Sequence, residues 1–110
     1  MNLETRLTEL RNLAAEYGKW ESKRVYLMEF RKSKKAILMR HAEMDGQKTA
    51  AAQERDAYAS EEYVDLLKGL EVATEQAVKL KWELVIAQEG IRAWQTLEAN
   101  KRAERKGYGA

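Results

Sequence analysis

The feature that most constrains the fold is a run of apolar residues spaced alternately three and four positions apart in the second half of the chain. This is the spacing of a heptad repeat, and it continues for more than four repeats. The chain contains no proline, so no proline breaks a helix that carries this repeat. The pattern predicts one long helix that packs lengthwise against another helix. We call these ten residues the seam: Tyr63, Leu66, Leu70, Ala73, Ala77, Leu80, Leu84, Ala87, Ile91 and Trp94.

The first part of the chain predicts a second long helix, over residues 3–43. Asn2 is a suitable N-cap, and Glu4 lies favourably in the first turn. Gly18 costs about 1 kcal/mol relative to alanine, which is too little to break a helix packed along its length. The apolar positions at helical spacing are Leu3, Leu7, Leu10, Ala14, Tyr17, Trp20, Leu27, Phe30, Ile37 and Met44.

The connection between these helices begins with Asp45-Gly46, the strongest turn signal in the chain. Residues 47–59 favour helix but lack a strong apolar face, so they form either a separate short helix or the exposed start of the last helix. Ser60 precedes two acidic residues, which is typical of an N-cap. The long helix is therefore expected over residues 61–105, with a flexible tail at 106–110.

Two helices of similar length with a short connection predict an all-α fold, with residues 1–110 as a single helical domain. We expect an elongated antiparallel helical hairpin, like a coiled coil, with a short connecting helix. A turn centred near residue 52 would place position i beside position 105 − i, for example Arg31 near Thr74. Charges support this orientation, because the basic run at 31–40 would lie beside the acidic run at 61–75.

The last helix carries more apolar surface than one partner helix can cover, because it is apolar on most sides between Leu80 and Leu97. We expect a homo-oligomer, a dimer or a larger helical bundle, or a separate protein partner. The alternative is that the connecting helix folds back over this face. The residues expected at the contact are Trp82, Val85, Ile86, Ala93, Trp94 and Leu97, and Gly90 would allow close approach.

The sequence contains few of the residues that catalysis needs. It has no cysteine, one histidine and no phosphate-binding glycine loop. His41-Ala42-Glu43 matches the start of a zinc deaminase signature, but the required cysteines and proline are missing. We expect no enzyme activity, no catalytic residue, no metal site, no cofactor and no small-molecule substrate. No signal core or membrane-length apolar run is present, which predicts a cytoplasmic protein without membrane contact.

Two basic clusters could bind nucleic acid, although the net charge is only +2. The internal cluster is Arg31, Lys32, Lys34 and Lys35, which the acidic run of the same chain could neutralise. The C-terminal cluster is Lys101, Arg102, Arg105 and Lys106. Cations at the end of a helix also favour its dipole without any ligand. In the nucleic-acid interpretation, Tyr108 could stack on a base.

The second half of the chain resembles small helical proteins of tailed phages and prophages. The segments that carry the resemblance are Glu54-Arg55-Asp56-Ala57, Ser60-Glu61-Glu62-Tyr63, Leu80-Lys81-Trp82, Ala87-Gln88 and residues 94–103, WQTLEANKRA. Genes of such proteins often lie near early-region recombination genes. The resemblance therefore implies a phage early protein in the cytoplasm of a bacterial host.

Two functions follow as hypotheses. The first is a non-enzymatic interaction protein, acting by protein–protein contact as an accessory factor in phage DNA recombination or replication, or as an inhibitor of a host defence nuclease. The second is a nucleic-acid-binding module that uses the two basic clusters.

Overall fold

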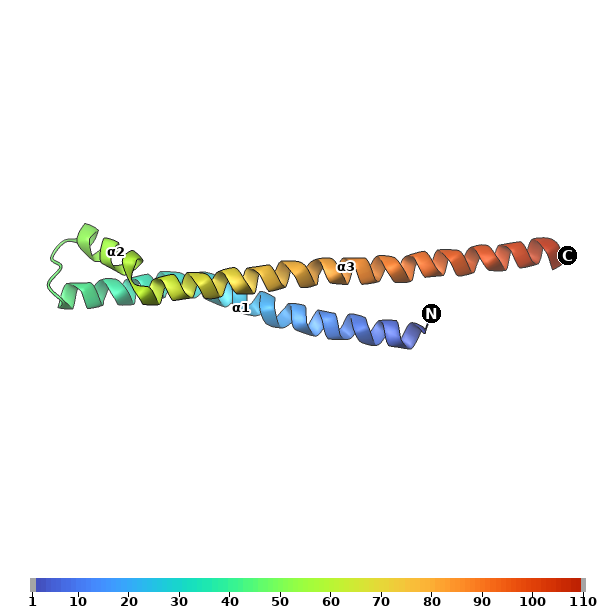
Figure 1. Ribbon diagram of the computed structural model, residues 1–110, viewed down its shortest axis with the longest axis horizontal. Helices are drawn as coiled ribbons and strands as arrows, with labels where there is room; N and C mark the ends of the chain where they lie inside the picture. The colour runs from blue at the N-terminus through green and yellow to red at the C-terminus, as the bar shows by residue number, and fades with distance from the viewer. Residues whose placement is uncertain (1, 110) are drawn as a thin grey trace. The chain divides into compact units, whose positions relative to one another are not determined.

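The computed structural model describes residues 2–109, with side chains as far as residue 107. Its described part is all-α and contains three helices: α1 (Leu3–Met44), α2 (Ala50–Ala59) and α3 (Glu61–Gly109). They form a helical hairpin with a short connecting helix, as the sequence predicts (Figure 1). Contacts divide the chain into two units. The hairpin unit is Gly18–Ala77, and the terminal unit combines the chain up to Tyr17 with the chain from Val78 onward.

The helix ends follow from the capping residues. The Asn2 side chain accepts a hydrogen bond from the Thr5 amide, as expected of an N-cap. After α1, Gly46 adopts a φ of 109°, and the amides of Gly46 and Gln47 donate to the carbonyls of Glu43 and Ala42. These two bonds make a Schellman motif, which stops the helix at the predicted turn.

The connection contains a separate short helix, which resolves the alternative that the sequence leaves open. The Thr49 hydroxyl accepts a hydrogen bond from the Ala52 amide and caps the start of α2. Ser60 then ends α2 in an extended conformation, and its hydroxyl accepts from the Glu62 amide at the start of α3. Residues 47–49 are not helical, although they were included in the predicted connector.

The end of α3 also differs from the prediction, because the helix continues from residue 105 to Gly109, where a flexible tail was expected. Glycine at 107 and 109 costs about 1 kcal/mol each in a helix interior, which lowers helix stability without forbidding the helical conformation. Ala110 lies outside the described residues.

The core of the hairpin unit lies where its three helices meet. Leu38 of α1, Ala57 of α2 and Tyr63 of α3 are each less than 10% exposed and form one cluster. The Tyr63 ring also meets the Tyr58 ring edge-on, with 5.2 Å between centroids. Because α2 contributes to this core, it occupies the space beside the last turns of α1.

This position of α2 changes the alignment of the long helices. Lys34 pairs with Glu62, and the Leu27 side chain lies 3.7 Å from where a Cβ on Gly69 would be, so both pairs of residue numbers add to 96. The expected sum of 105 was wrong by nine residues. The reason is that α2 packs beside the end of α1, so α3 begins beside Lys34 rather than beside Met44.

The seam was predicted correctly on α3, because none of its ten residues is exposed in the structure. The expected positions on α1 were less accurate. Leu38 and Ala42 are the buried residues of that helix. Several expected positions are instead exposed: Leu3, Leu7, Ala14, Ile37 and Met44.

Candidate interaction surface

The terminal unit exposes a line of apolar side chains on α3. Trp82 is 59% exposed, Ile86 68% and Leu97 58%, and Ala93 is exposed as well. Residues four or seven positions apart lie on one face of a helix, so Trp82, Ile86, Ala93 and Leu97 lie along the same side of α3. We call these four residues the stripe. A single partner helix can bury only one face of α3, and α1 buries the face that carries the seam. The stripe lies on a different face and stays exposed.

The other two residues predicted for this contact lie elsewhere. Val85 is 36% exposed and, as the neighbour of Ile86, points about 100° away from it around the helix. Trp94 is partly buried, because it is the last residue of the seam. The structure thus brings four of the six predicted residues onto one face.

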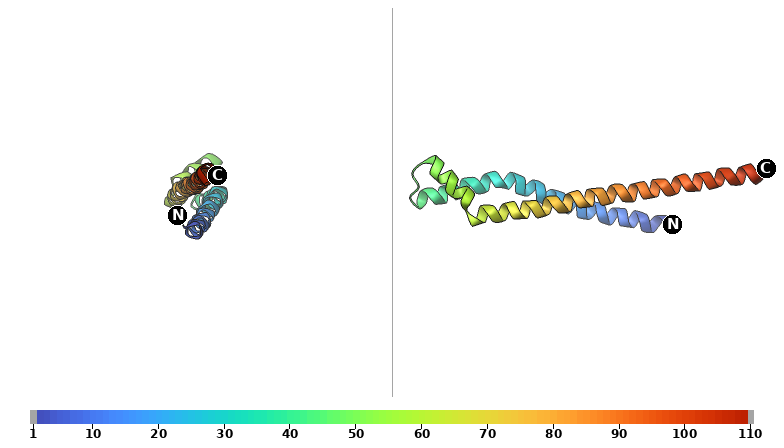
Figure 2. Two further views of the ribbon diagram at one scale, coloured as in Figure 1. Left: turned by 90° about the vertical axis from the view of Figure 1, so that its right-hand side faces the viewer. Right: turned by 45° about the horizontal axis from the view of Figure 1, so that its top comes forward.

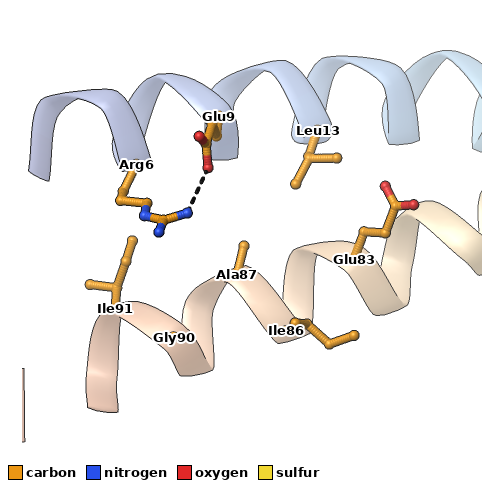
Figure 3. A pocket seen from close by; sticks show the side chains of 8 residues that line it. All are labelled: Arg6, Glu9, Leu13, Glu83, Ile86, Ala87, Gly90 and Ile91. Atoms are coloured by element: carbon orange, nitrogen blue, oxygen red, sulfur yellow. Dashed lines mark hydrogen bonds and ion pairs between the residues drawn. The ribbon is translucent and has the colours of Figure 1, made fainter. Parts of the chain in front are cut away.

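A groove runs beside the stripe, between the first turns of α1 and the middle of α3 (Figure 3). Its volume is about 430 Å³. Ala87 and Ile91 point toward α1, whereas Ile86 points away from it. The residues that line the groove are Arg6, Glu9, Leu13, Glu83, Ile86, Ala87, Gly90 and Ile91.

The groove combines an apolar floor with charged edges. Arg6 and Glu9 form an ion pair of 3.3 Å on the α1 side. On the α3 side, Gly90 has no side chain, and no atom lies within 4 Å of the position where its Cβ would be. The backbone of α3 is therefore accessible beside Ile86, which would let another helix come close.

The internal basic cluster is partly neutralised within the hairpin unit. Lys34 Nζ lies 2.6 Å from Glu62 Oε2, and Lys35 Nζ lies 3.1 Å from Glu54 Oε1. The hydrogen bond from Lys34 lowers the pKa of Glu62 below its usual value. Lys35 also lies 4.8 Å from the centre of the Tyr58 ring; its contacts with Tyr58 and then Glu54 raise its pKa. The expected pairing of basic and acidic runs is thus confirmed for Lys34.

The C-terminal cluster has fewer acidic partners. Lys101 pairs with Glu98 at 3.5 Å, and Arg105 donates to the Lys101 carbonyl. Arg102, Arg105 and Lys106 form no ion pair with any residue that the structure describes. This part of α3 also extends beyond the first residues of α1 (Figures 1 and 2). Its positive charge is accordingly open to an anionic partner.

His41 lies in the last turn of α1. It shares a shallow pocket with three acidic residues, Asp45, Asp56 and Glu62. Within residues 2–109, no group of three or more histidine, cysteine, aspartate or glutamate side chains is arranged to hold a metal ion.

Comparison of the chain with protein-family models, with curated proteins and with solved structures finds no match. Among the helices described here, none combines the length and apolar content that crossing a membrane requires.

Proposed function

We propose that this chain is a non-enzymatic interaction protein that binds an apolar helix of another protein molecule through the stripe on α3. The observation that carries the proposal is the exposure of Trp82, Ile86 and Leu97, each more than half accessible to solvent on one helix face. Large apolar residues that are exposed together on one helix face mark contact sites on soluble proteins. Tryptophan is also enriched among the residues that contribute most to binding energy.

The resemblance to phage early proteins suggests the class of partner. A protein of phage recombination or replication, or a host defence nuclease in the bacterial cytoplasm, would present such a helix. In either case the chain acts by binding to a surface of the partner protein and catalyses no reaction of its own.

Affinity capture from bacterial and phage-infected extracts tests this proposal. The immobilised proteins are the wild type, the stripe variant Leu97→Asp and a matched control, Val72→Asp, whose wild-type residue is 50% exposed on α3 outside the stripe. We expect proteins retained by the wild type and the control to be lost with Leu97→Asp. Identical sets of captured proteins on all three would contradict the proposal.

A second candidate function is binding of nucleic acid by the C-terminal cluster. The observation that favours it is the lack of acidic partners for Arg102, Arg105 and Lys106 among the described residues. Four cations on two successive helical turns suit contact with phosphates. The internal cluster is the weaker candidate, because Lys34 and Lys35 already pair with glutamates.

Fluorescence anisotropy with single-stranded and duplex DNA tests this second function. If four phosphates are contacted on a duplex, affinity should fall roughly 100-fold between 50 and 200 mM salt. Replacing the four residues of the C-terminal cluster with alanine should abolish that binding, whereas the same replacement in the internal cluster should have a smaller effect. Absence of binding at low salt would exclude this function.

A further inference from the structure

The face of α3 that carries the seam loses its partner helix near Trp94. Arg6 and Ile91 line one groove, so Leu3, the first residue of α1, lies near Trp94 at the end of the seam. Beyond that point α3 continues for about 15 residues, or roughly 22 Å. Figures 1 and 2 show this part of α3 running past the start of α1. We call residues 95–109 the free end of α3.

The heptad spacing of the seam continues into the free end, but its residues become charged. The next positions after Trp94 are Glu98, Lys101 and Arg105, at steps of four, three and four. Glu98 pairs with Lys101, which leaves a net positive charge on this face. A basic face packed against α1 would bury charge at a high cost, but here α1 no longer covers it. The change from apolar to basic where α1 stops indicates an anionic partner for the free end.

The four residues of the C-terminal cluster form two rows along the free end. Lys101 and Arg105 make the first row, because residues four positions apart lie on one side of a helix. Arg102 and Lys106 make the second row in the same way. The rows lie about 100° apart around the helix axis, which is the angle between adjacent residues. All four side chains are exposed, so the cations are displayed on two neighbouring sides of one helix.

The helix dipole accounts for only part of this positive charge. Its effect on a cation is confined to the last turn of a helix. Within the C-terminal cluster, only Lys106 lies in the last turn of α3, whereas Lys101 lies about two turns before the end. Acids of the free end do not neutralise the cluster either, since Glu98 and Glu104 are two acids against four cations. The remaining charge is available to a ligand.

We propose that the free end of α3 binds duplex DNA by lying in the major groove, with one row of cations toward each phosphate backbone. This inference rests on the second candidate function, because it names the nucleic acid that the C-terminal cluster binds. The two backbones border the groove on opposite sides of an inserted helix, so two rows of cations suit it better than one.

The dimensions of the free end also fit the groove. The major groove of B-DNA is about 12 Å wide, and an α-helix with its side chains is about 10–12 Å across. A single helix fits such a groove, whereas two helices with axes about 8–10 Å apart are too wide for it. The free end is the part of α3 that runs without α1, and the cluster lies within it.

Other anionic partners suit the free end less well. The major groove of duplex RNA is too deep and narrow for side chains to read. Single strands are bound largely by stacking on aromatic residues, and Tyr108 is the one aromatic residue in the free end. A membrane surface would need large apolar residues beside the cations, but the apolar residues between positions 98 and 107 are two alanines, Ala99 and Ala103. Duplex DNA is therefore the partner that the observations favour.

Fluorescence anisotropy with three probes of about 20 nucleotides or base pairs tests the choice of partner: duplex DNA, duplex RNA and single-stranded DNA. At about 50 mM salt, we expect the wild type to bind duplex DNA at least roughly 10-fold more tightly than either other probe. Equal or tighter binding of another probe would overturn the major groove as the site but leave nucleic-acid binding in place. Absence of binding to all three would overturn this inference and the second candidate function together.

A modified duplex separates the two grooves of DNA. Bulky groups at C5 of thymine fill the major groove, because the C5-methyl group of thymine lies there. The wild type should bind such a duplex at least roughly 10-fold more weakly than the unmodified one. Netropsin in the minor groove of an A·T-rich duplex should change the affinity by less than about 2-fold. The reverse pattern would place the free end in the minor groove and overturn the proposal.

Glutamine variants test whether both rows contact phosphates. The variants are Lys101→Gln/Arg105→Gln for the first row, Arg102→Gln/Lys106→Gln for the second, and Lys68→Gln/Lys81→Gln as the matched control, which removes the same charge from exposed positions of α3 outside the free end. Each row variant should reduce the loss of duplex affinity between 50 and 200 mM salt from roughly 100-fold to roughly 10-fold, because two phosphate contacts are removed. The control should keep the wild-type salt dependence.

All three variants should keep the helical circular dichroism of the wild type, because lysine, arginine and glutamine have similar helix propensities. A row variant with the wild-type salt dependence would show that its row contacts no phosphate and would overturn the two-sided contact. An equal loss in the control would show that binding follows the total charge of α3 instead of the free end.

Discussion

Replacing Gly69 with alanine should stabilise the protein, and the result tests how the two long helices are aligned. Gly69 lies inside α3 in the hairpin unit, where glycine costs about 1 kcal/mol relative to alanine. The added Cβ would lie 3.7 Å from Cδ1 of Leu27. That distance is an ordinary van der Waals contact, so the new methyl group meets no clash. We expect the free energy of unfolding to rise by about 1 kcal/mol, equivalent to about 4 °C in Tm.

Thermal unfolding followed by circular dichroism at a fixed protein concentration measures this change. Gly18→Ala is the matched control, because Gly18 lies in α1 and nothing comes within 4 Å of its missing Cβ. Both variants should therefore gain stability from helix propensity. If Gly18→Ala raises Tm while Gly69→Ala lowers it, the added methyl group meets a different neighbour, and the alignment of Leu27 with Gly69 is refuted.

Three further perturbations probe the hairpin unit. Tyr63→Ala should lower the free energy of unfolding in urea by about 3–5 kcal/mol, because it leaves a cavity in the core and removes the edge-on contact with the Tyr58 ring. A loss below about 1 kcal/mol would contradict the presence of Tyr63 in that core. Thr49→Ala should lower the free energy of unfolding by about 1 kcal/mol and speed hydrogen exchange of the Ala52 amide, which the Thr49 hydroxyl caps. Unchanged exchange at Ala52 would show that the cap does not stabilise α2. The ion pair with Lys34 lowers the pKa of Glu62, so the stability that this pair contributes is present above the ordinary pKa of an unfolded glutamate and is lost as pH falls through the lower folded pKa. Glu62→Gln should weaken the fall of the free energy of unfolding at acid pH. If the dependence of stability on pH is unchanged in this variant, other carboxylates cause it.

The sequence predicted α3 well because its seam is uniformly apolar. Ten positions at heptad spacing leave one choice of inward face, and that face is the one found. On α1 the partly buried positions include Arg24 and Lys34, whose charges interrupt the apolar pattern. Apolar periodicity alone therefore selected Ile37 over Leu38 near the end of that helix, although Leu38 is the buried one.

The alignment of the helices could not be read from the sequence for a different reason. It depends on α2, whose buried contribution to the core is a single alanine, Ala57. A small residue like this leaves no clear apolar face in the pattern. The stripe, by contrast, was foreseen as surplus apolar area on α3. Helical geometry alone separates it from Val85, which lies about 100° from Ile86 around the helix, and from Trp94, which already belongs to the seam.

The compact core of the hairpin unit also has a consequence for the order in which the chain folds. The ion pairs beside this core join residues 19 and 28 positions apart. In the terminal unit, Arg6 and Ile91 line one groove, and their separation along the chain is roughly three times the larger of these two. Closing the longer loop first would cost about 1 kcal/mol more in chain entropy. We therefore expect folding to begin around the turn at Gly46 and the cap at Thr49, and helix pairing to extend from there in short steps.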